Sequence, residues 1–317
     1  MNIINKKIDF WFIKFPIIFP IIYFSILYFF PNSESYLIVL TILLLAEPHF
    51  AATWPIFINK KNTQYIQKNK FSLIYGNLFI FIFCILGFIF FRNTFLLIFY
   101  FFNVFHVTKQ SIGVLRLYEN KEIGLNFKIH SIYIFNALFF LIGFFKFYTN
   151  TIDEITMVYV NYVVYLSLIL TIILFYFKYR DLRKIFLMIS GIIIFLPICF
   201  IENPVHGILM GVTIHYSQYL IITAKVKIGR EGFKIESLFE LTKKLSKSNF
   251  LKFILIYSLL MTFFSISTKI FINESFLKNL LIIPITFQML HFYIDSYIWR
   301  FRDAHNRKEV LRYILND

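Results

Sequence analysis

Charged side chains are scarce in this sequence. Asp, Glu, Lys and Arg together make up 15% of the 317 residues, and 59% of the residues are hydrophobic. A soluble globular domain has about a quarter of its residues charged and about half apolar. The mean hydropathy of +0.71 points the same way. The shortage of charge excludes an ordinary soluble domain and predicts an integral membrane protein.

Cysteine and several recognisable motifs are also missing or nearly so. The two cysteines, Cys84 and Cys199, both lie inside apolar runs, which argues against a disulfide framework and against a cysteine metal site. There is no glycine-rich phosphate loop and no internal repeat. Transporters with inverted repeats show matched, interrupted helices in their two halves, and this pattern is absent too. These absences leave one integral domain over residues 1–317 as the simplest organisation.

The sequence does contain a series of long apolar runs. Each is about 20 residues long, enough to cross a hydrocarbon core of ~30 Å as a helix. We predict an all-α, polytopic helical bundle with about ten transmembrane helices. The predicted spans are 10–30, 36–57, 72–91, 96–118, 130–148, 159–178, 185–201, 205–226, 250–270 and 276–299.

Lys and Arg gather in alternate loops between these runs. One set of loops includes "NKKNTQYIQKNK", "KYRDLRK" and the tail "RFRDAHNRK", whereas the other includes "PNSES", "TNTIDEIT" and "INES". Because basic residues are retained on the cytoplasmic side, we expect both termini and the tail 300–317 in the cytoplasm, and the chain in a cell inner membrane. The net charge of +15 then needs no nucleic acid. The basic segment 227–249 fits either an amphipathic helix on the inner leaflet or an ordinary solvated loop.

Four histidines lie deep inside separate predicted spans. His49, His106, His215 and His291 each fall about 10 to 15 residues from the outer end of a span, or roughly 15–20 Å at the helical rise. Polar groups at this depth are costly and face a bundle interior or a cavity. Imidazole binds zinc, iron and copper, so four histidines in one layer favour a metal site. The alternative is that each histidine forms a hydrogen bond between helices.

Asp295 follows His291 by one helical turn in "LHFYIDSYIWRF". Side chains at i and i+4 share a helix face, so the carboxylate is placed to accept an N–H from a ligand histidine and orient it. In the alternative interpretation Asp295 pairs with Arg300 or Arg302 at the membrane interface.

Two further polar residues are candidates for a role in the site. Tyr219 lies one turn after His215 and can donate a hydrogen bond. Glu47 faces elsewhere on its own helix, with three roles open to it: a proton carrier, a support for a ligand, or a partner of Lys109. The remaining histidines are predicted to be interfacial or solvated: His130, His206 and His305.

These segments resemble a known set of motifs. In chain order they look like the membrane β-carotene 15,15′-dioxygenases of bacteria and archaea, the Brp/Blh family. Pro48–His49 matches that family's first motif, His106 the second, and His215 the first member of its histidine pair. The final motif, a histidine followed by aspartate four residues later, matches His291 and Asp295. The resemblance covers four short segments and not the chain between them.

The sequence departs from the family pattern at three positions. Phe50 stands in place of a glycine, Tyr219 in place of the second histidine of the pair, and Leu290 in place of a proline. The resemblance implies a membrane non-haem Fe(II) dioxygenase that uses dioxygen to cleave β-carotene to retinal, with the four buried histidines as iron ligands and Tyr219 facing an open position. Oxidation of another lipid at the same metal is one alternative. A proton- or metal-coupled transporter using the buried histidines is another.

Overall fold

The computed structural model describes residues 3–119, 125–149, 153–181, 185–233, 237–270 and 279–315. In these ranges the ordered elements are all helices, and no strand occurs. An apolar chain in lipid must satisfy its backbone hydrogen bonds within each segment, and a helix does so. The predicted all-α class is confirmed.

Eight helical stretches in the described residues are long and apolar enough to cross a membrane. They are Lys6–Phe29, Pro31–Phe57, Phe71–Phe90, Arg92–Glu119, Leu125–Thr149, Ile155–Tyr179, Asn249–Ser267 and Asn279–Ile298. They correspond to eight of the ten predicted spans.

The two other predicted spans have a different character. The seventh becomes a shorter apolar helix, Phe186–Cys199, in which α10 (Phe186–Ile192) passes into the 3₁₀ helix η9 (Ile193–Cys199). The eighth lies within α11 (Pro204–Arg230), which is long enough to cross a bilayer but is not among the apolar stretches. Polar residues such as His215 and Gln218 lower the mean hydropathy of this helix. Both of these side chains are buried.

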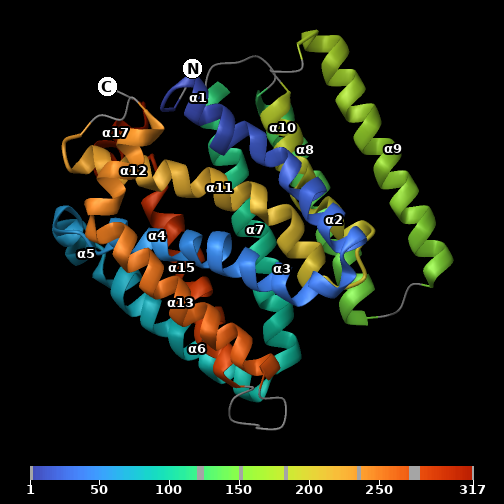
Figure 1. Ribbon diagram of the computed structural model, residues 1–317, viewed down its shortest axis with the longest axis horizontal. Coiled ribbons are helices and arrows are strands. Elements are labelled where there is room, and N and C mark those ends of the chain that lie inside the picture. Colours follow the sequence, from blue (N-terminus) through green and yellow to red (C-terminus); the bar gives the residue numbers. More distant parts are fainter. Residues whose placement is uncertain are drawn as a thin grey trace. The chain divides into compact units, whose positions relative to one another are not determined.

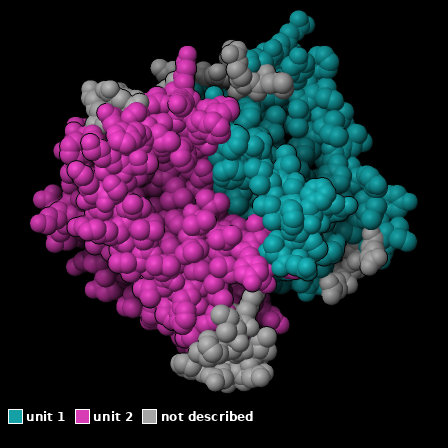
Figure 2. Space-filling model, viewed as in Figure 1, with its two compact units in different colours: residues 1, 13–33, 103–215 teal, residues 2–12, 34–102, 216–317 magenta. Residues whose placement is uncertain are grey.

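The chain packs as two compact units, coloured separately in Figure 2. Unit 1 contains residues 1, 13–33 and 103–215, and unit 2 contains residues 2–12, 34–102 and 216–317. Three of the boundaries fall inside helical elements, η1 (Phe10–Lys14), α7 (Arg92–Glu119) and α11, and one falls between η3 (Pro31–Ser33) and α3 (Glu34–Thr41).

Unit 1 is built around α8, which packs against α10 and η9. A Cβ on Gly211 of α11 would lie 1.6 Å from the carbonyl oxygen of Ile194 in η9. Only a glycine allows this close backbone approach. The helix α8 spans Leu125–Phe144, and the other elements lying wholly in unit 1, besides α10 and η9, are η2 (Phe15–Ile18), α2 (Phe19–Phe29), η3 (Pro31–Ser33), η7 (Phe145–Thr149) and α9 (Glu154–Tyr179).

In unit 2, α13 packs along α4, and α15 packs against α6 and α4 (Figure 1). The elements lying wholly in unit 2 are α1 (Lys6–Asp9), α3 (Glu34–Thr41), η4 (Ile42–Ala46), α4 (Glu47–Phe57), η5 (Lys60–Asn62), α5 (Thr63–Lys68), η6 (Phe71–Tyr75), α6 (Gly76–Phe90), α12 (Leu238–Lys247), α13 (Asn249–Ile270), η10 (Asn279–Leu281), α15 (Ile282–Ile298), α16 (Ala304–Asn306), η11 (Arg307–Leu311) and α17 (Arg312–Leu315). The contacts of α4 with α15 bring buried polar side chains of these two helices together.

Candidate metal-binding site

The helix α4 carries two polar side chains on one face in unit 2. It begins after a π-helical turn, η4, and has Pro48 in its first turn. Proline lacks the N–H that would continue the regular helical ladder, and a wider turn accommodates that loss; π-helical turns often occur at functional sites. His49 and Thr53 follow one turn apart, with 1% and 0% of their surface exposed. Both therefore point into the protein.

The helix α15 supplies the second pair. His291 and Asp295 are one turn apart and are 0% and 2% exposed. Their separation on one helix brings Nε2 of His291 to 3.6 Å from Oδ2 of Asp295. Asp295 is buried, whereas the interfacial alternative placed it at the membrane boundary beside an arginine. The guanidinium of Arg300 instead lies 4.3 Å from the ring centre of Tyr297.

Thr53 is the centre of the hydrogen-bond network that joins these helices. Its hydroxyl donates to Oδ1 of Asp295 at 2.9 Å and lies 2.7 Å from Nδ1 of His291. The hydroxyl of Tyr219, on α11, donates to the same oxygen of Asp295 at 2.9 Å and lies 2.6 Å from the Thr53 oxygen. Asp295 thus orients His291 through Thr53. Thr53 was not predicted from the sequence, although a hydroxyl one turn after a buried histidine is a signal for it.

The hydrogen bonds around Thr53 determine which ring nitrogen of His291 carries the proton. Because the Thr53 proton goes to the carboxylate, its oxygen accepts from Nδ1–H of His291, and we assign the Nδ1–H tautomer on that basis. Nε2 then carries a lone pair and lies 3.6 Å from Oδ2 of Asp295. Two lone-pair atoms bound to one ion at about 2.1 Å are roughly 3.0–3.6 Å apart for ordinary ligand angles, and these two are 3.6 Å apart. The pair fits a shared cation, and both residues have ligand atoms that could hold a metal ion.

His49 is the second buried imidazole of unit 2, next to His291. Its ring centre is 4.6 Å from that of His291 and 4.3 Å from that of Tyr219. Phe50, at the position where the resembling family has glycine, packs its ring 5.1 Å from His291 and 5.9 Å from Tyr216. The polar group therefore has an aromatic wall.

Glu47 faces away from this group, as expected for a residue two positions before His49. It is 1% exposed, and its Oε1 accepts a hydrogen bond of 3.4 Å from Nε2 of Gln288 on α15. Its contact in unit 2 is thus an amide of the same helix that carries His291.

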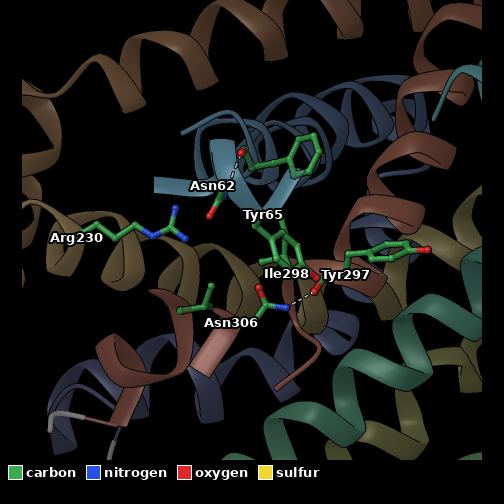
Figure 3. Close-up of a pocket in the computed structure, with 8 residues that line it drawn as sticks. Asn62, Tyr65, Arg230, Tyr297, Ile298 and Asn306 are labelled. Carbon is green, nitrogen blue, oxygen red and sulfur yellow. Dashed lines mark hydrogen bonds between the residues drawn. The ribbon is translucent and has the colours of Figure 1, made fainter. Parts of the chain in front are cut away.

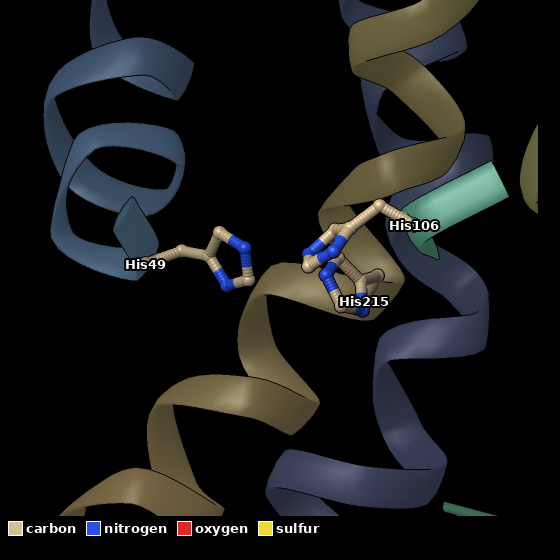
Figure 4. Close-up of side chains that lie close together, drawn as sticks. All are labelled: His49, His106 and His215. Carbon is tan, nitrogen blue, oxygen red and sulfur yellow. The ribbon is translucent and has the colours of Figure 1, made fainter. Parts of the chain in front are cut away.

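Unit 1 holds the other two histidines predicted as ligands. His106 on α7 and His215 on α11 are 7% and 1% exposed, and their ring centres are 6.0 Å apart (Figure 4). A ring nitrogen of one lies within 4.8 Å of a ring nitrogen of the other. Lys109, one turn along α7, places its ammonium 5.1 Å from the ring centre of Tyr133. Unit 1 therefore contains a buried histidine pair.

Among the three histidines predicted to be interfacial or solvated, His206 is the one that is fully buried. His206 is 1% exposed, and its Nδ1 is 2.8 Å from the hydroxyl of Tyr23 in the same unit. His206 is therefore not solvated, because a tyrosine from a distant segment covers it, and its place at the membrane interface stays a prediction. His130 is exposed, with Nδ1 2.6 Å from the carbonyl oxygen of Asn126. His305 is half-buried and stacks on Tyr65 with ring centres 4.5 Å apart.

A small cavity in unit 2 lies away from the buried histidines. Its volume is about 10 Å³, close to the smallest space that holds one water molecule. Asn62, Tyr65, Arg230 and Asn306 contribute polar lining (Figure 3). A cavity of this size has no room for an organic substrate.

Comparisons of this chain with family models, with curated proteins and with solved structures gave no match to any of them.

Proposed function

We propose that this chain is a membrane non-haem iron oxygenase that cleaves a hydrophobic polyene, most specifically β-carotene to retinal. The observation that carries the proposal is the arrangement in unit 2 around His291. Its Nδ1 is held by Thr53 at 2.7 Å while its Nε2 and the Asp295 carboxylate lie 3.6 Å apart. Such an orienting hydrogen bond on the far nitrogen is what metal-binding histidines have.

The proposed ligands start from His49 and His291, the two buried imidazoles of unit 2. His106 and His215 are included because of their equal depth in the sequence, which stays a prediction. Imidazole nitrogens with the Asp295 carboxylate beside His291 suit Fe(II), and the resemblance to the Brp/Blh motifs favours iron over zinc or copper. When bound, ferrous iron supplies the redox centre for dioxygen, and the protein supplies orientation and a dry pocket.

The chain's own residues have distinct tasks in this proposal. Asp295 and Thr53 hold the His291 ring in one tautomer and one orientation. The Tyr219 hydroxyl, where the family has a histidine, faces the open position and donates a hydrogen bond of 2.9 Å to Asp295. Phe50 and Phe292 form an apolar wall against His291, which fits a polyene chain. Central cleavage balances as one β-carotene plus one dioxygen giving two retinal molecules, with one oxygen atom in each aldehyde.

The proposed membrane arrangement follows from the distribution of charge. We propose ten spans, both termini in the cytoplasm and a cell inner membrane as the location. In that arrangement α11 crosses the bilayer with its polar side chains turned inward. Its buried Thr213, His215 and Gln218 support this, since each is less than 4% exposed.

The first test is elemental analysis of the detergent-purified protein, followed by incubation with β-carotene in air. We expect about one iron per chain, as for a catalytic metal site, and formation of retinal. The variant His49→Ala should lose the iron, and His130→Ala, which alters an exposed histidine, should keep it. A protein without metal after anaerobic reconstitution with Fe(II) would contradict the proposal.

The alternatives give different results in the same assay. Dioxygen consumption with an added membrane lipid, but no retinal from β-carotene, would indicate oxidation of another lipid. Iron binding without any dioxygen consumption, together with uptake of metal or protons into proteoliposomes, would indicate a transporter.

A further inference from the structure

The basic segment between α11 and α13 contains a strongly two-sided helix, α12. Ser237 caps its start by accepting a hydrogen bond of 3.2 Å from the Glu240 amide, and the helix runs to Lys247. The membrane-spanning stretch Asn249–Ser267 begins after a single intervening residue. This short connection places α12 at the boundary between hydrocarbon and water.

One side of α12 is apolar and only partly covered by protein. On this side Leu241 is 3% exposed and packs into unit 2, whereas Leu238 is 40% exposed. Phe239, which is 74% exposed, lies at the edge between this side and the lysines. Phe233, just before the helix, is 51% exposed. Three large apolar side chains thus remain uncovered in a segment that leads directly into a membrane span.

The other side of α12 is basic. Lys243, Lys244 and Lys247 lie there with one acidic residue, Glu240. Two of these lysines lie over the exposed aromatic rings: Lys243 is 6.0 Å from the Phe239 ring centre, and Lys244 is 4.3 Å from that of Phe233. Ammonium groups next to exposed aromatic rings suit the membrane interface, where lipid phosphate groups lie above the first carbons of the acyl chains.

We propose that α12 and Phe233 form a docking surface for anionic phospholipid headgroups. Phe233, Leu238 and Phe239 insert at the level where acyl chains begin, and Lys243, Lys244 and Lys247 contact the phosphates. Of the two interpretations of residues 227–249, the exposed aromatic residues favour the leaflet helix over the solvated loop. A solvated loop would leave these large apolar side chains in water, which is unfavourable compared with contact with acyl chains.

The first experiment measures the depth of α12 with the full-length chain in lipid nanodiscs. A fluorescent label is attached at Phe239→Cys or, in a second variant, at Lys247→Cys; the native cysteines are buried, at 0% and 3% exposure. Lipids brominated near the top of the acyl chain should quench the label at position 239 strongly and the label at 247 weakly. Equal quenching of both labels by aqueous iodide, without quenching by brominated lipid, would overturn the proposal.

The second experiment measures retention of phosphatidylglycerol by native mass spectrometry. The variant Lys243→Gln/Lys244→Gln/Lys247→Gln should bind it roughly fivefold more weakly per lysine removed. The matched control, Lys60→Gln/Lys68→Gln/Lys70→Gln, removes three exposed lysines elsewhere in unit 2 and should retain more lipid. Equal loss in both variants would show a general charge effect and contradict a specific surface. A label at 239 that is shielded only in a dimeric species would assign the surface to a second copy instead.

Discussion

The two units of this protein both bury polar groups, but they compensate them differently. In unit 1 the Lys128 ammonium forms an ion pair with Glu119, with side-chain exposures of 0% and 7%, and it lies 4.8 Å from the ring centre of Tyr179. Opposite charges there neutralise each other. In unit 2 a histidine nitrogen and a carboxylate oxygen, each carrying a lone pair in the assigned tautomer, face one another at 3.6 Å.

The difference separates structural polar groups from candidate ligands. A pair of opposite charges that satisfies itself needs nothing more, although its net contribution to stability is small. Two acceptors held face to face by a third group, Thr53, repel each other unless a cation or proton lies between them. We therefore read the Lys128–Glu119 pair as structural and propose the His291–Asp295 group as a candidate metal-binding site.

The sharpest test of this comparison replaces one histidine in each unit. We expect His291→Ala to abolish iron binding, because it removes a ligand and leaves Asp295 without its neighbour. His106→Ala should also abolish binding if both units supply ligands, as the sequence predicts. Elemental analysis of the two purified variants measures this. Loss in His291→Ala with full retention in His106→Ala would restrict the metal to unit 2.

The next largest effect concerns the ion pair of unit 1. Lys128→Met alone should lower the free energy of unfolding by about 3–5 kcal/mol, because it leaves the Glu119 carboxylate buried without its partner. The double variant Lys128→Met/Glu119→Leu should recover most of that loss. Unfolding in mixed detergent–SDS micelles compares the three proteins. A single variant as stable as the parent would show that the pair is not buried in the membrane-embedded protein.

A smaller effect is expected at Thr53. Thr53→Val keeps the shape of the side chain but removes the hydroxyl that joins His291 to Asp295. Supporting residues of this kind typically contribute 10- to 100-fold to metal affinity, so we expect a loss in that range. Thr53→Ser retains the hydroxyl and serves as the control. Competition with a ferrous chelator measures both, and equal affinities for the two variants would remove Thr53 from the site.

The smallest effect concerns His305, a histidine of unit 2 outside the spans. Burial, with the positive charges of Arg230 and Lys308, lowers the pKa of its imidazole, outweighing Glu309 and Asp303. Its folded pKa is therefore below the unfolded value of about 6.5, so its contribution to stability is present above that pH and is lost as the pH falls through the folded pKa. Melting temperatures between pH 8 and 5 should fall slightly more for the parent than for His305→Gln. The reverse order would contradict the shift.

The part of the site that follows from one helix could be predicted. His291 and Asp295 are brought together by the helical pitch alone, since residues four apart share a face. The apolar runs likewise predicted the helical class, and eight of them are long and apolar enough to cross a membrane. Local spacing was sufficient for both conclusions.

Contacts between helices could not be predicted in the same way. Nothing in the spacing of α4 and α15 indicates that the Thr53 hydroxyl meets His291 and Asp295, or that Tyr23 covers His206. These meetings depend on which helix faces pack together, and that is decided by the fit of many side chains distant in sequence.

The sequence by itself determined that this protein favours a lipid environment and that its secondary structure is helical, because apolar length and helical period are local properties. It also determined which polar residues are costly to bury in the spans. The tertiary structure alone decided how those residues are compensated: as an ion pair in unit 1, and around Thr53 in unit 2. Compensation depends on distances of a few ångströms between groups from different helices, and such distances exist only after the helices have packed.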